Sequence, residues 1–541
     1  MSHILPPPVG GHRAIERQGA ERVRSTDARW TTGAEAQTLD AVAAMLPGGV
    51  RYGPASTLVT GIADHSGAVR PGYLFACLPG LRHDGHRFAH DAVARGAAAL
   101  LTERRLDAPP GVPQVVVPDA RLALALLARA WHDAVDRRLH VLAVTGTNGK
   151  TTTCFMLGSI FAAAGRPLGR LGTAGHQLGS RAVDATLTTP GPLQLHAMLA
   201  EIASAGYRGV VLEASSHALS QHRLAGLAVD TAVFTNLTRD HMDYHGNPMA
   251  YLEAKTRLFA PRLDAKPYPA LAIVPADSGV GRRVAAASSP HRRVLTYGFT
   301  AHADVRGHLR RTPAGREVLS ISGAWGEGEV SLPLPGRHNA LNGLAAAAAA
   351  LGNGLPFACV RDGLAAVGTV PGRFERVDAG EGPAVIVDFA HNPSGLREAL
   401  RTARRVCDGR LRLVFGCKGG DADEEKRYRM GVIAARLADE IYVTTDDPYD
   451  EPPRETARLA LEALAANGAS HRWIADRQAA IACAVAEAGS ADVVLVAGRG
   501  HEHVQRVGGQ ELPLDDRALC REALAARGTP AAVAAIAGLQ G

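Results

Sequence analysis

The chain has 541 residues, of which 46% are hydrophobic and 21% charged, and its formal net charge at pH 7 is +6. This composition is that of an ordinary globular protein, so it argues against a disordered or fibrous chain, and the length allows about three domains. The basic residues are mostly scattered arginines. This pattern disfavours a nucleic-acid partner and suits a phosphate-rich small substrate.

The seven cysteines are widely spaced and form no C-x-x-C pair, so we expect reduced thiols rather than zinc ligands or disulfides. Residues 1–35 lack the apolar region of a secretory signal and predict a flexible tail. No apolar run reaches the roughly 18 residues that a membrane span needs. We therefore expect a cytoplasmic monomer with no nucleic-acid partner and no membrane span.

The region 36–138 predicts a small α/β domain. Short β-like runs ("LFACL", "AALLTE", "PQVVVP") alternate with a helical pattern, "RFAHDAVARGA". A longer helix is predicted at "DARLALALLARAWHDAV", because its apolar residues recur at helical spacing. This helix leads into the next domain.

The region 139–336 predicts a P-loop-type central domain built on a doubly wound parallel sheet. An apolar run at 139–144 is followed by a glycine-containing turn and a helix, "TTTCFMLGSIFAAAG", and further strands are expected at "GVVLEAS" and "TAVFTNL". Residues 337–375 continue this domain with the helix "LNGLAAAAAALGNG" and end in a linking loop, "VPGRFERV". The region 376–541 then repeats the strand-helix alternation and predicts a Rossmann-like C-terminal domain.

The stretch "VLAVTGTNGKTTT" predicts a phosphate-binding loop of unusual length. The common pattern G-x-x-x-x-G-K-[ST] would place its first glycine at Val144. A phosphate cradle needs only a tight turn, backbone N–H groups at a helix start and a lysine. A plain turn is the alternative. The predicted ATP contacts are Gly146, Thr147, Asn148, Gly149, Lys150, Thr151 and Thr152.

Together with "GTNGK", four further motifs resemble those of the Mur ligase family: "EASSHALSQHR", "TNLTRDHMDYHG", "GRHNALN" and "VDFAHNP". The likeness covers most of residues 55–525. "YLEAKTRLF" and "AGRGHE" resemble the branch that adds the third amino acid in peptidoglycan precursor synthesis. The resemblance implies a UDP-sugar-binding N-terminal domain, a central ATPase domain and an amino-acid-binding C-terminal domain.

The resemblance also implies a chemistry. ATP phosphorylates the terminal carboxylate of UDP-N-acetylmuramoyl-L-Ala-D-Glu (UDP-MurNAc-L-Ala-D-Glu), and the amine of a diamino acid attacks the resulting acyl phosphate. Lys150 would hold the outer phosphates, with Mg²⁺ on Thr151 and Glu213. His241 would bind a second metal, and Lys255 resembles a lysine that the family carries as a carbamate. The alternatives are a Glu213 facing water, a structural His241 and a surface Lys255.

Further contacts follow from the same resemblance. It implies ATP contacts at Asn339, Asn342, Arg373 and Asp388, although asparagines at a helix start are often caps. Asp240 and His245 are expected to be local scaffold. The sugar-nucleotide peptide would meet Ser66, Thr188, Thr189, Ser215, Gln221 and Arg223. The stretch around Ser66, "HSGAV", lacks the arginine of the family's D-S-R-x-V.

The amino-acid site departs from the pattern of diaminopimelate-adding relatives, which carry D-N-P-R. Here the letters are "DDPY", from Asp446, Asp447 and Pro448 to Tyr449. Negative charge on Asp447, Asp450 and Glu451 favours a cationic side chain such as that of lysine. The amino-acid contacts retained from the family are Arg427, Gly498 and Glu502.

Two alternatives remain open. A related enzyme of specialised metabolism could join an amino acid to a different carboxylic acid while keeping every ATP contact. A nucleotide-sensing module could bind ATP without forming any bond. The carboxylic acid on which phosphate release depends distinguishes the first alternative from the cell-wall ligase. A protein that binds ATP but never releases phosphate would fit the second alternative.

Overall fold

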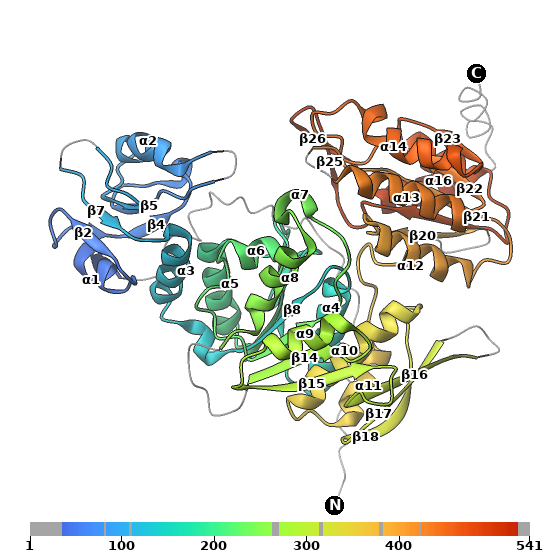
Figure 1. The fold of residues 1–541 in the computed structure, drawn as a ribbon, viewed down its shortest axis with the longest axis horizontal. Helices are drawn as coiled ribbons and strands as arrows, with labels where there is room; N and C mark the ends of the chain where they lie inside the picture. The colour runs from blue at the N-terminus through green and yellow to red at the C-terminus, as the bar shows by residue number, and fades with distance from the viewer. Residues whose placement is uncertain are drawn as a thin grey trace, which may run out of the picture.

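The computed structural model describes residues 35–80, 83–107, 111–261, 270–312, 317–377, 382–420 and 423–527. Figure 1 shows three α/β bodies in chain order, the N-terminal one in blue, the central one in green and yellow, and the C-terminal one in orange and red. The predicted three-domain α/β fold is confirmed. The tail predicted for 1–35 lies outside the described residues except for Glu35. No helix in the described ranges has both the length and the apolar character needed to cross a membrane.

The N-terminal domain is built on a five-stranded sheet in the order β2-β7-β6-β5-β4. Its elements are β1 (Gln37–Thr38), α1 (Leu39–Ala44), β2 (Val50–Tyr52), β3 (Leu58–Val59), β4 (Gly61–Ala63), η2 (Ser66–Ala68), β5 (Tyr73–Ala76), η3 (Gly85–Phe88), α2 (Ala89–Ala94), β6 (Ala99–Thr102), β7 (Gln114–Val116) and α3 (Ala120–Trp131). β4 to β7 are parallel. Every residue of β5 and β6 is buried, as is usual where helices cover both faces of a sheet.

Helix α3 joins the first two domains. The Asp119 side chain accepts a hydrogen bond from the Leu122 N–H and thereby caps the helix start. Its apolar side packs in the same core as Leu193, which belongs to the central domain. The N-terminal domain is therefore anchored beside the start of α5.

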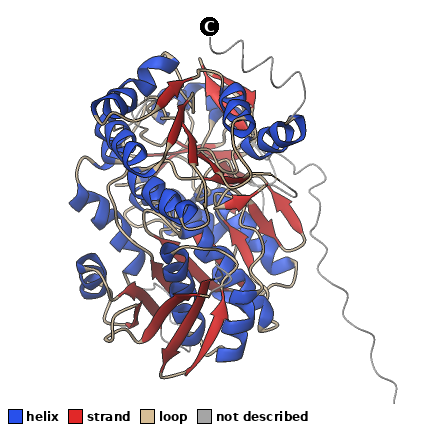
Figure 2. Ribbon diagram, turned by 90° about the vertical axis from the view of Figure 1, so that its right-hand side faces the viewer, coloured by secondary structure: helices blue, strands red, loops and turns tan. Residues whose placement is uncertain are grey.

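The central domain contains an eleven-stranded sheet flanked by helices (Figure 2). Its elements are η4 (Val135–Arg138), β8 (His140–Thr145), α4 (Lys150–Ala163), β9 (Gly169–Leu171), β10 (His176–Leu178), β11 (Arg181–Val183), α5 (Pro192–Ser204), β12 (Gly209–Glu213), α6 (Ser216–Ser220), β13 (Thr231–Phe234), α7 (Met242–His245), α8 (Pro248–Thr256), η5 (Arg257–Phe259), β14 (Ala270–Pro275), α9 (Gly279–Ala287), β15 (Arg292–Gly298), β16 (Val305–Arg311), β17 (Glu317–Gly323), β18 (Gly326–Ser331), α10 (Arg337–Gly352) and α11 (Phe357–Ala365).

This sheet is parallel only in its middle. The strand order is β11-β10-β9-β12-β8-β13-β14-β15-β16-β17-β18, and the strands from β9 to β16 in that order run parallel. The outer strands β10, β11, β17 and β18 are antiparallel, which the sequence analysis did not predict. Two residues separate β17 from β18, and so short a connection can join only antiparallel strands.

Helix α10 lies in the core of the central domain. Its alanines are fully buried and pack with α4 and the neighbouring strands. α11 comes so close to α4 that a Cβ on Gly363 would lie 2.4 Å from the Cα of Ile160. The helices of region 337–375 therefore fix the position of α4, whose first residues form the phosphate loop.

The C-terminal domain is a six-stranded sheet in the order β19-β20-β24-β21-β22-β23, with a separate hairpin, β25–β26. Its elements are β19 (Glu375–Arg376), β20 (Ala384–Asp388), α12 (Pro393–Arg404), β21 (Leu411–Phe415), α13 (Glu424–Leu437), β22 (Glu440–Val443), α14 (Pro453–Ala466), β23 (His471–Trp473), α15 (Arg477–Ala486), β24 (Val493–Ala497), β25 (Val504–Val507), β26 (Gln510–Pro513) and α16 (Asp516–Ala526). All strands of the sheet are parallel except β19, which forms inside the predicted loop "VPGRFERV".

Candidate active site

The turn between β8 and α4 accepts only glycine at two positions. Gly146 has φ +141°, and a Cβ there would lie 1.9 Å from Thr235 Oγ1. Gly149 has φ +86°, and its Cβ would lie 2.3 Å from Asn342 Oδ1. Backbone of this kind suits glycine and lets the loop approach its neighbours closely. The short loop is therefore a tightly packed structure that depends on both glycines.

The segment that follows β13 supports this loop. The Thr147 N–H donates to the Asn236 carbonyl at 2.9 Å, and the Asn148 N–H donates to Asn236 Oδ1 at 3.0 Å. Thr147 Oγ1 also donates to the Thr238 carbonyl at 3.1 Å. Because these bonds reach 88 to 91 positions along the chain, the loop conformation depends on the folded sheet.

Lys150 is the cation of the loop. Its Nζ donates to the Gly146 carbonyl at 3.0 Å and the Thr147 carbonyl at 2.9 Å. Burial lowers the pKa of Lys150, while the nearby Glu213 acts in the opposite direction. The amine thus lies at the start of α4, where backbone N–H groups favour an anion.

Glu213, the last residue of β12, accepts hydrogen bonds from both neighbouring threonines. Thr151 Oγ1 lies 3.0 Å from each carboxylate oxygen, the Thr173 N–H donates at 2.8 Å, and Thr173 Oγ1 donates at 3.1 Å. Only 2% of Glu213 is exposed, so the alternative of a water-facing carboxylate is wrong. A hydroxyl and a carboxylate side by side form the oxygen donor set that suits Mg²⁺.

Lys255 is buried beneath the loop. It is 1% exposed, and its Nζ donates to the Gly146 carbonyl at 2.9 Å and lies 4.4 Å from the Tyr251 ring centroid. Burial, reinforced by Lys150, lowers the pKa of Lys255 well below its usual range. The alternative of a surface lysine is therefore wrong.

His241 is the N-cap residue of α7 and has an unusual backbone conformation, φ +56°. Its ring packs edge-on against His217 at a centroid distance of 4.9 Å. Desolvation lowers the pKa of His241 to about 3, although Asp240 acts in the opposite direction. The imidazole is therefore neutral near pH 7, which is the form that binds metals.

Asp240 joins the central domain to the C-terminal one. It accepts hydrogen bonds from Lys426 Nζ at 3.0 Å and from Asn392 Nδ2 at 3.1 Å. Asn392 also exchanges amide hydrogen bonds with Asn148 of the phosphate loop, at 3.0 and 3.4 Å. The expectation that Asp240 is local scaffold is wrong, because its partners are 152 and 186 positions away.

Arg373 brings the linker to the same place. Its Nη2 donates to Thr151 Oγ1 at 3.0 Å, and its guanidinium lies 4.5 Å from the Phe389 ring centroid. Asp388 Oδ2 accepts from the Phe374 N–H at 2.6 Å, and burial raises the pKa of Asp388 to about 6 although Arg373 opposes this. Arg373 therefore links the phosphate loop to the end of β20 in the C-terminal domain, where Asp388 lies.

Asn339 and Asn342 lie within the first turns of α10. Asn342 Nδ2 donates to Asn339 Oδ1 at 3.2 Å, and Asn339 Nδ2 donates to the Pro335 carbonyl at 2.8 Å. The residue at the N-cap is Gly336, so the alternative that these asparagines cap the helix is wrong. The contact of Asn342 with Gly149 places the pair beside the loop.

The residues predicted to bind the sugar-nucleotide peptide gather on the other side of Glu213. Thr189 Oγ1 donates to the Glu213 carbonyl at 2.7 Å and accepts from the Ser215 N–H at 3.0 Å. Arg223 Nη1 donates to the Thr189 carbonyl at 2.9 Å, and its Nη2 donates to Gln221 Oε1 at 2.7 Å. The group is therefore one hydrogen-bonded cluster.

Thr188 and Ser66 extend this cluster in different ways. The hydroxyl oxygens of Thr188 and Thr173 lie 3.1 Å apart, next to Glu213. Ser66 belongs to the N-terminal domain, where its hydrogen bond lowers the pKa of Asp91. Asp64, two residues before Ser66, lies against Gly191, because a Cβ on that glycine would be 4.0 Å from Asp64 Oδ2. The N-terminal domain thus faces the cluster along this edge.

The predicted amino-acid site contains a network of ion pairs. Arg499 Nη1 lies 2.5 Å from Asp447 Oδ1 and 3.3 Å from Asp446 Oδ1. Lys418 Nζ donates to both oxygens of Glu502, at 3.1 and 3.2 Å, and lies 3.4 Å from Asp447. Burial opposes charge on Lys418, but the carboxylates prevail and raise its pKa. Sequence reasoning missed Lys418 and Arg499, because both meet Asp447 from loops that follow other strands.

The acids near the DDPY stretch are largely paired. Arg427 forms a two-pronged ion pair with Glu451, with distances of 3.0 and 3.2 Å. Asp447 pairs with Arg499 and Glu451 pairs with Arg427, so two of the three carboxylates expected to attract a cationic side chain already have cationic partners. The preference for a cationic side chain stays a prediction. Gly498 has φ +117°, and a Cβ added at this position would lie 2.6 Å from Asp446 Oδ2, so no larger side chain fits here.

The end of the DDPY stretch turns toward solvent. Pro448 is buried, and a Cβ on Gly419 would lie 2.1 Å from its carbonyl oxygen. Tyr449 has φ +53° and is 36% exposed. Its ring also lies against Gly420. The stretch is thus held by close backbone contacts on one side.

Three family descriptions match consecutive parts of the chain. They are "Mur ligase family, catalytic domain" at residues 58–132, "Mur ligase middle domain" at 144–350 and "Mur ligase, glutamate ligase domain" at 372–500. The matches follow the order of the three α/β bodies.

Two relatives carry the same name, UDP-N-acetylmuramoyl-L-alanyl-D-glutamate--2,6-diaminopimelate ligase. The one from Geobacillus thermodenitrificans is 41% identical over 463 residues, which are 85% of this chain and 93% of the relative. The one from Solibacter usitatus is 40% identical over 473 residues, 87% of this chain and 94% of the relative.

Solved structures agree with this likeness. A solved structure with the same ligase name is 30% identical and has a TM-score of 0.63, and the match covers 91% of this chain and 99% of the other chain. UDP-N-acetylmuramoylalanyl-D-glutamyl-2,6-diaminopimelate--D-alanyl-D-alanyl ligase from Acinetobacter baumannii is similar in fold at 22% identity. Its TM-score is 0.58, and it covers 92% of this chain and 98% of its own.

Proposed function

Because the chain belongs to the Mur ligase family of ATP-dependent amide-forming ligases, we propose that it adds a diamino acid to UDP-MurNAc-L-Ala-D-Glu in peptidoglycan precursor synthesis. Because both relatives are named as 2,6-diaminopimelate ligases, we infer that 2,6-diaminopimelate is the amino acid that is added. The roles of the individual site residues are part of the same proposal.

One observation carries the proposal. Lys150, Glu213 and Arg373, from three separate segments, converge on Thr151 and the short loop. Transfer of a phosphoryl group between two anions is limited by charge repulsion, so the main requirement is positive charge and fixed N–H donors. This arrangement supplies both at the start of α4.

In the first step the γ-phosphorus of ATP forms a bond to a carboxylate oxygen of the substrate's glutamate, and the bond to the β-phosphate oxygen breaks to release ADP. In the second step the amine of the amino acid attacks the acyl carbon. Inorganic phosphate leaves, and the amine loses a proton. Lys150 and Arg373 balance the charge of the phosphates during both steps, and the backbone N–H groups at the start of α4 orient them.

Thr151 and Glu213 would hold Mg²⁺, which when bound neutralises charge on the β- and γ-phosphates. Lys255 lies beneath the same loop and has a lowered pKa, so its neutral amine is able to add CO₂ and form a carbamate. A carbamate there, together with the neutral His241, would provide an oxygen and a nitrogen ligand for a second metal. We propose these two residues as that second site.

The cluster of Thr188, Thr189, Ser215, Gln221 and Arg223 is proposed to bind the peptide end of the nucleotide substrate, and Ser66 its uridine end. Asn339 and Asn342 would bind adenine, and Asp388 the ribose. The site that holds the amino acid comprises Arg427, Asp446, Asp447, Pro448, Tyr449, Gly498 and Glu502. We propose a cytoplasmic monomer, in keeping with the seven free cysteines and the supply of ATP in that compartment.

The test is ADP release by purified protein with ATP, Mg²⁺ and UDP-MurNAc-L-Ala-D-Glu against a panel of amino acids. We expect release that depends on both the dipeptide substrate and meso-diaminopimelate. Lys150→Ala should reduce it by on the order of 1000-fold, whereas Arg310→Ala, which removes an exposed arginine of β16, should not.

Two outcomes would contradict the proposal. Release that requires a different carboxylic acid would identify an enzyme of specialised metabolism. Tight ATP binding without phosphate release for any pair of acid and amine would identify a nucleotide-sensing module. Undiminished amide synthesis by Lys150→Ala would overturn the assignment of the loop itself.

A further inference from the structure

The DDPY stretch and strand β25 form one hydrogen-bonded unit. The Tyr449 N–H donates to the Arg506 carbonyl at 3.1 Å, and the Arg506 N–H donates to Asp447 Oδ1 at 2.9 Å. Gln505 Nε2 donates to the Asp446 carbonyl at 2.6 Å. Tyr449 and Val507 are bridge partners. The position of residue 506 is therefore fixed relative to the whole stretch.

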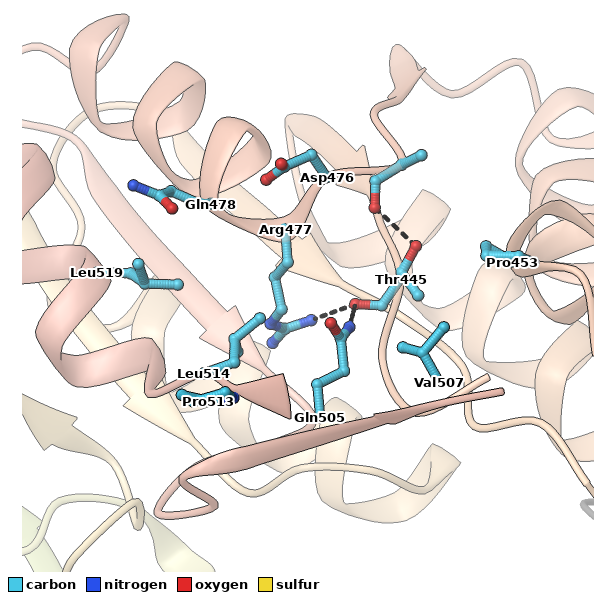
Figure 3. Close-up of a pocket in the computed structure, with 11 residues that line it drawn as sticks. Thr445, Pro453, Asp476, Arg477, Gln478, Gln505, Val507, Pro513, Leu514 and Leu519 are labelled. Carbon is cyan, nitrogen blue, oxygen red and sulfur yellow. Dashed lines mark hydrogen bonds between the residues drawn. The ribbon is translucent and has the colours of Figure 1, made fainter. Parts of the chain in front are cut away.

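Alternation along β25 sets the direction of Arg506. Gln505 and Val507 point from the hairpin into a cavity of about 400 Å³ that Thr445, Arg477 and Leu514 also line (Figure 3). Successive side chains of a strand point to opposite faces. Arg506 therefore points away from this cavity, toward the face on which Asp447 lies.

The guanidinium of Arg506 is only loosely held. Its Nη1 lies 3.7 Å from Asp447 Oδ2 and its Nη2 lies 3.4 Å from Glu511 Oε1, and 40% of the side chain is exposed. Direct charge-assisted hydrogen bonds to carboxylates are about 2.7–2.9 Å long. Donors of this guanidinium thus remain available for an additional anion.

The other cations around the stretch are committed to protein carboxylates. Arg427 forms the two-pronged pair with Glu451. Arg499 is fully buried against Asp446 and Asp447. Among the described residues near Tyr449, Arg506 is therefore the arginine best placed to meet an incoming carboxylate.

A chain of contacts connects this arginine to the phosphate loop. Arg373, which reaches Thr151, lies against Phe389, and Lys418 Nζ lies 5.9 Å from the centroid of the same ring. Lys418 in turn meets Glu502 and Asp447, and Asp447 meets Arg506. An amino acid lying along this line would have its reacting amine toward the loop and its far end at Arg506.

We propose that Arg506 binds the side-chain carboxylate of the incoming amino acid and so selects a diamino dicarboxylic acid over lysine. It would thereby supply the guanidinium that Tyr449 cannot provide. A planar fork of N–H donors matches a carboxylate in two places, which gives both affinity and discrimination. This inference rests on the proposed function, because it concerns the amino acid of that reaction.

The test compares wild type with Arg506→Gln, Arg506→Lys and the double variant Arg506→Gln/Tyr449→Arg, using ADP release with meso-diaminopimelate or lysine. We expect Arg506→Gln to raise the KM for diaminopimelate by about tenfold or more. The KM for ATP and for UDP-MurNAc-L-Ala-D-Glu should stay within about twofold, and so should turnover with lysine. The KM of Arg506→Lys for diaminopimelate should lie between those of wild type and Arg506→Gln, because an ammonium keeps the positive charge but lacks the planar fork of donors. The double variant should regain selectivity.

Arg458→Gln serves as the control, since it removes an exposed arginine of α14 in the same domain. An unchanged KM for diaminopimelate in Arg506→Gln would overturn the inference, as would an equal loss with lysine. If Arg506→Gln misfolds, the test relies on Arg506→Lys. The inference is then overturned if this variant keeps the wild-type KM for diaminopimelate and the wild-type preference for diaminopimelate over lysine. Wild type that uses no amino acid at all would overturn the proposed function, and this inference with it.

Discussion

Arg373 and Thr151 are 222 positions apart, and yet Arg373 Nη2 donates a hydrogen bond to Thr151 Oγ1 at 3.0 Å. Thr151 belongs to the first turn of α4, whereas Arg373 lies in the linker just before the C-terminal domain. Thr151 also donates to Glu213. The position of the linker, and with it the C-terminal domain, is therefore tied to the groups that we assign to the phosphates.

We expect Arg373→Ala to reduce kcat by about 10- to 100-fold, because a hydrogen bond involving a charged group contributes about 1.5–3 kcal/mol. The KM for the amino acid should change little, since Arg373 is proposed to act on the phosphates. Steady-state ADP release measures both quantities. A kcat within about twofold of wild type would show that the contact with Thr151 has no role in the reaction.

Gly146→Ala tests the conformation of the short loop. A methyl group at this position would overlap Thr235 Oγ1, and a φ of +141° is unfavourable for alanine. We expect the dissociation constant of ATP to rise by on the order of 100-fold, because the loop must move away from Asn236. Isothermal titration with a non-hydrolysable ATP analogue measures this.

Gly158→Ala is the matched control, since Gly158 lies in α4 and a Cβ there meets nothing within 4 Å. Alanine is about 1 kcal/mol better than glycine in a helix interior, so this variant should bind ATP normally and be at least as stable. Equal affinities for the two variants would contradict the loop argument.

Lys255 gives a prediction about CO₂. Its buried amine has a pKa well below the usual range, so the uncharged form that reacts with CO₂ is present near pH 7. We expect activity to fall when the enzyme is prepared in CO₂-free buffer and to return when bicarbonate is added. Lys255→Arg, which keeps a long basic side chain but forms no stable carbamate, should be inactive and insensitive to bicarbonate. Activity independent of bicarbonate in wild type would exclude the carbamate.

The elements that could be predicted from sequence are those whose signal is local. The short loop and the strand that carries Glu213 each follow from a few adjacent letters. The antiparallel edge strands β17 and β18 were missed, as was the bond between Asp240 and Lys426, 186 positions apart. Such pairs depend on how sheets and domains pack, and no periodicity along the chain encodes that. Arg506 was missed for the same reason, since only the pairing of β25 with the DDPY stretch gives it meaning.

His196 predicts a specific pH dependence of stability. It is fully buried in α5, and within the described ranges neither ring nitrogen has a hydrogen-bond partner. Burial lowers the pKa of His196 to about 3. Between about pH 3 and its unfolded pKa of about 6.5, the unfolded state therefore binds more protons than the native state, and stability falls as the pH decreases. Between about pH 7.5 and about pH 5.5, this histidine alone should lower the free energy of unfolding by roughly 1 kcal/mol.

The variant His196→Leu tests this prediction. On acidification from about pH 7.5 to about pH 5.5, the free energy of unfolding of the central domain, measured with urea, should decrease by roughly 1 kcal/mol less in the variant than in wild type. At about pH 7.5 the variant should be no less stable than wild type, because it removes a buried unbonded N–H. If both proteins lose the same free energy on acidification, His196 is protonated in the native state and its surroundings are not as dry as the structure indicates.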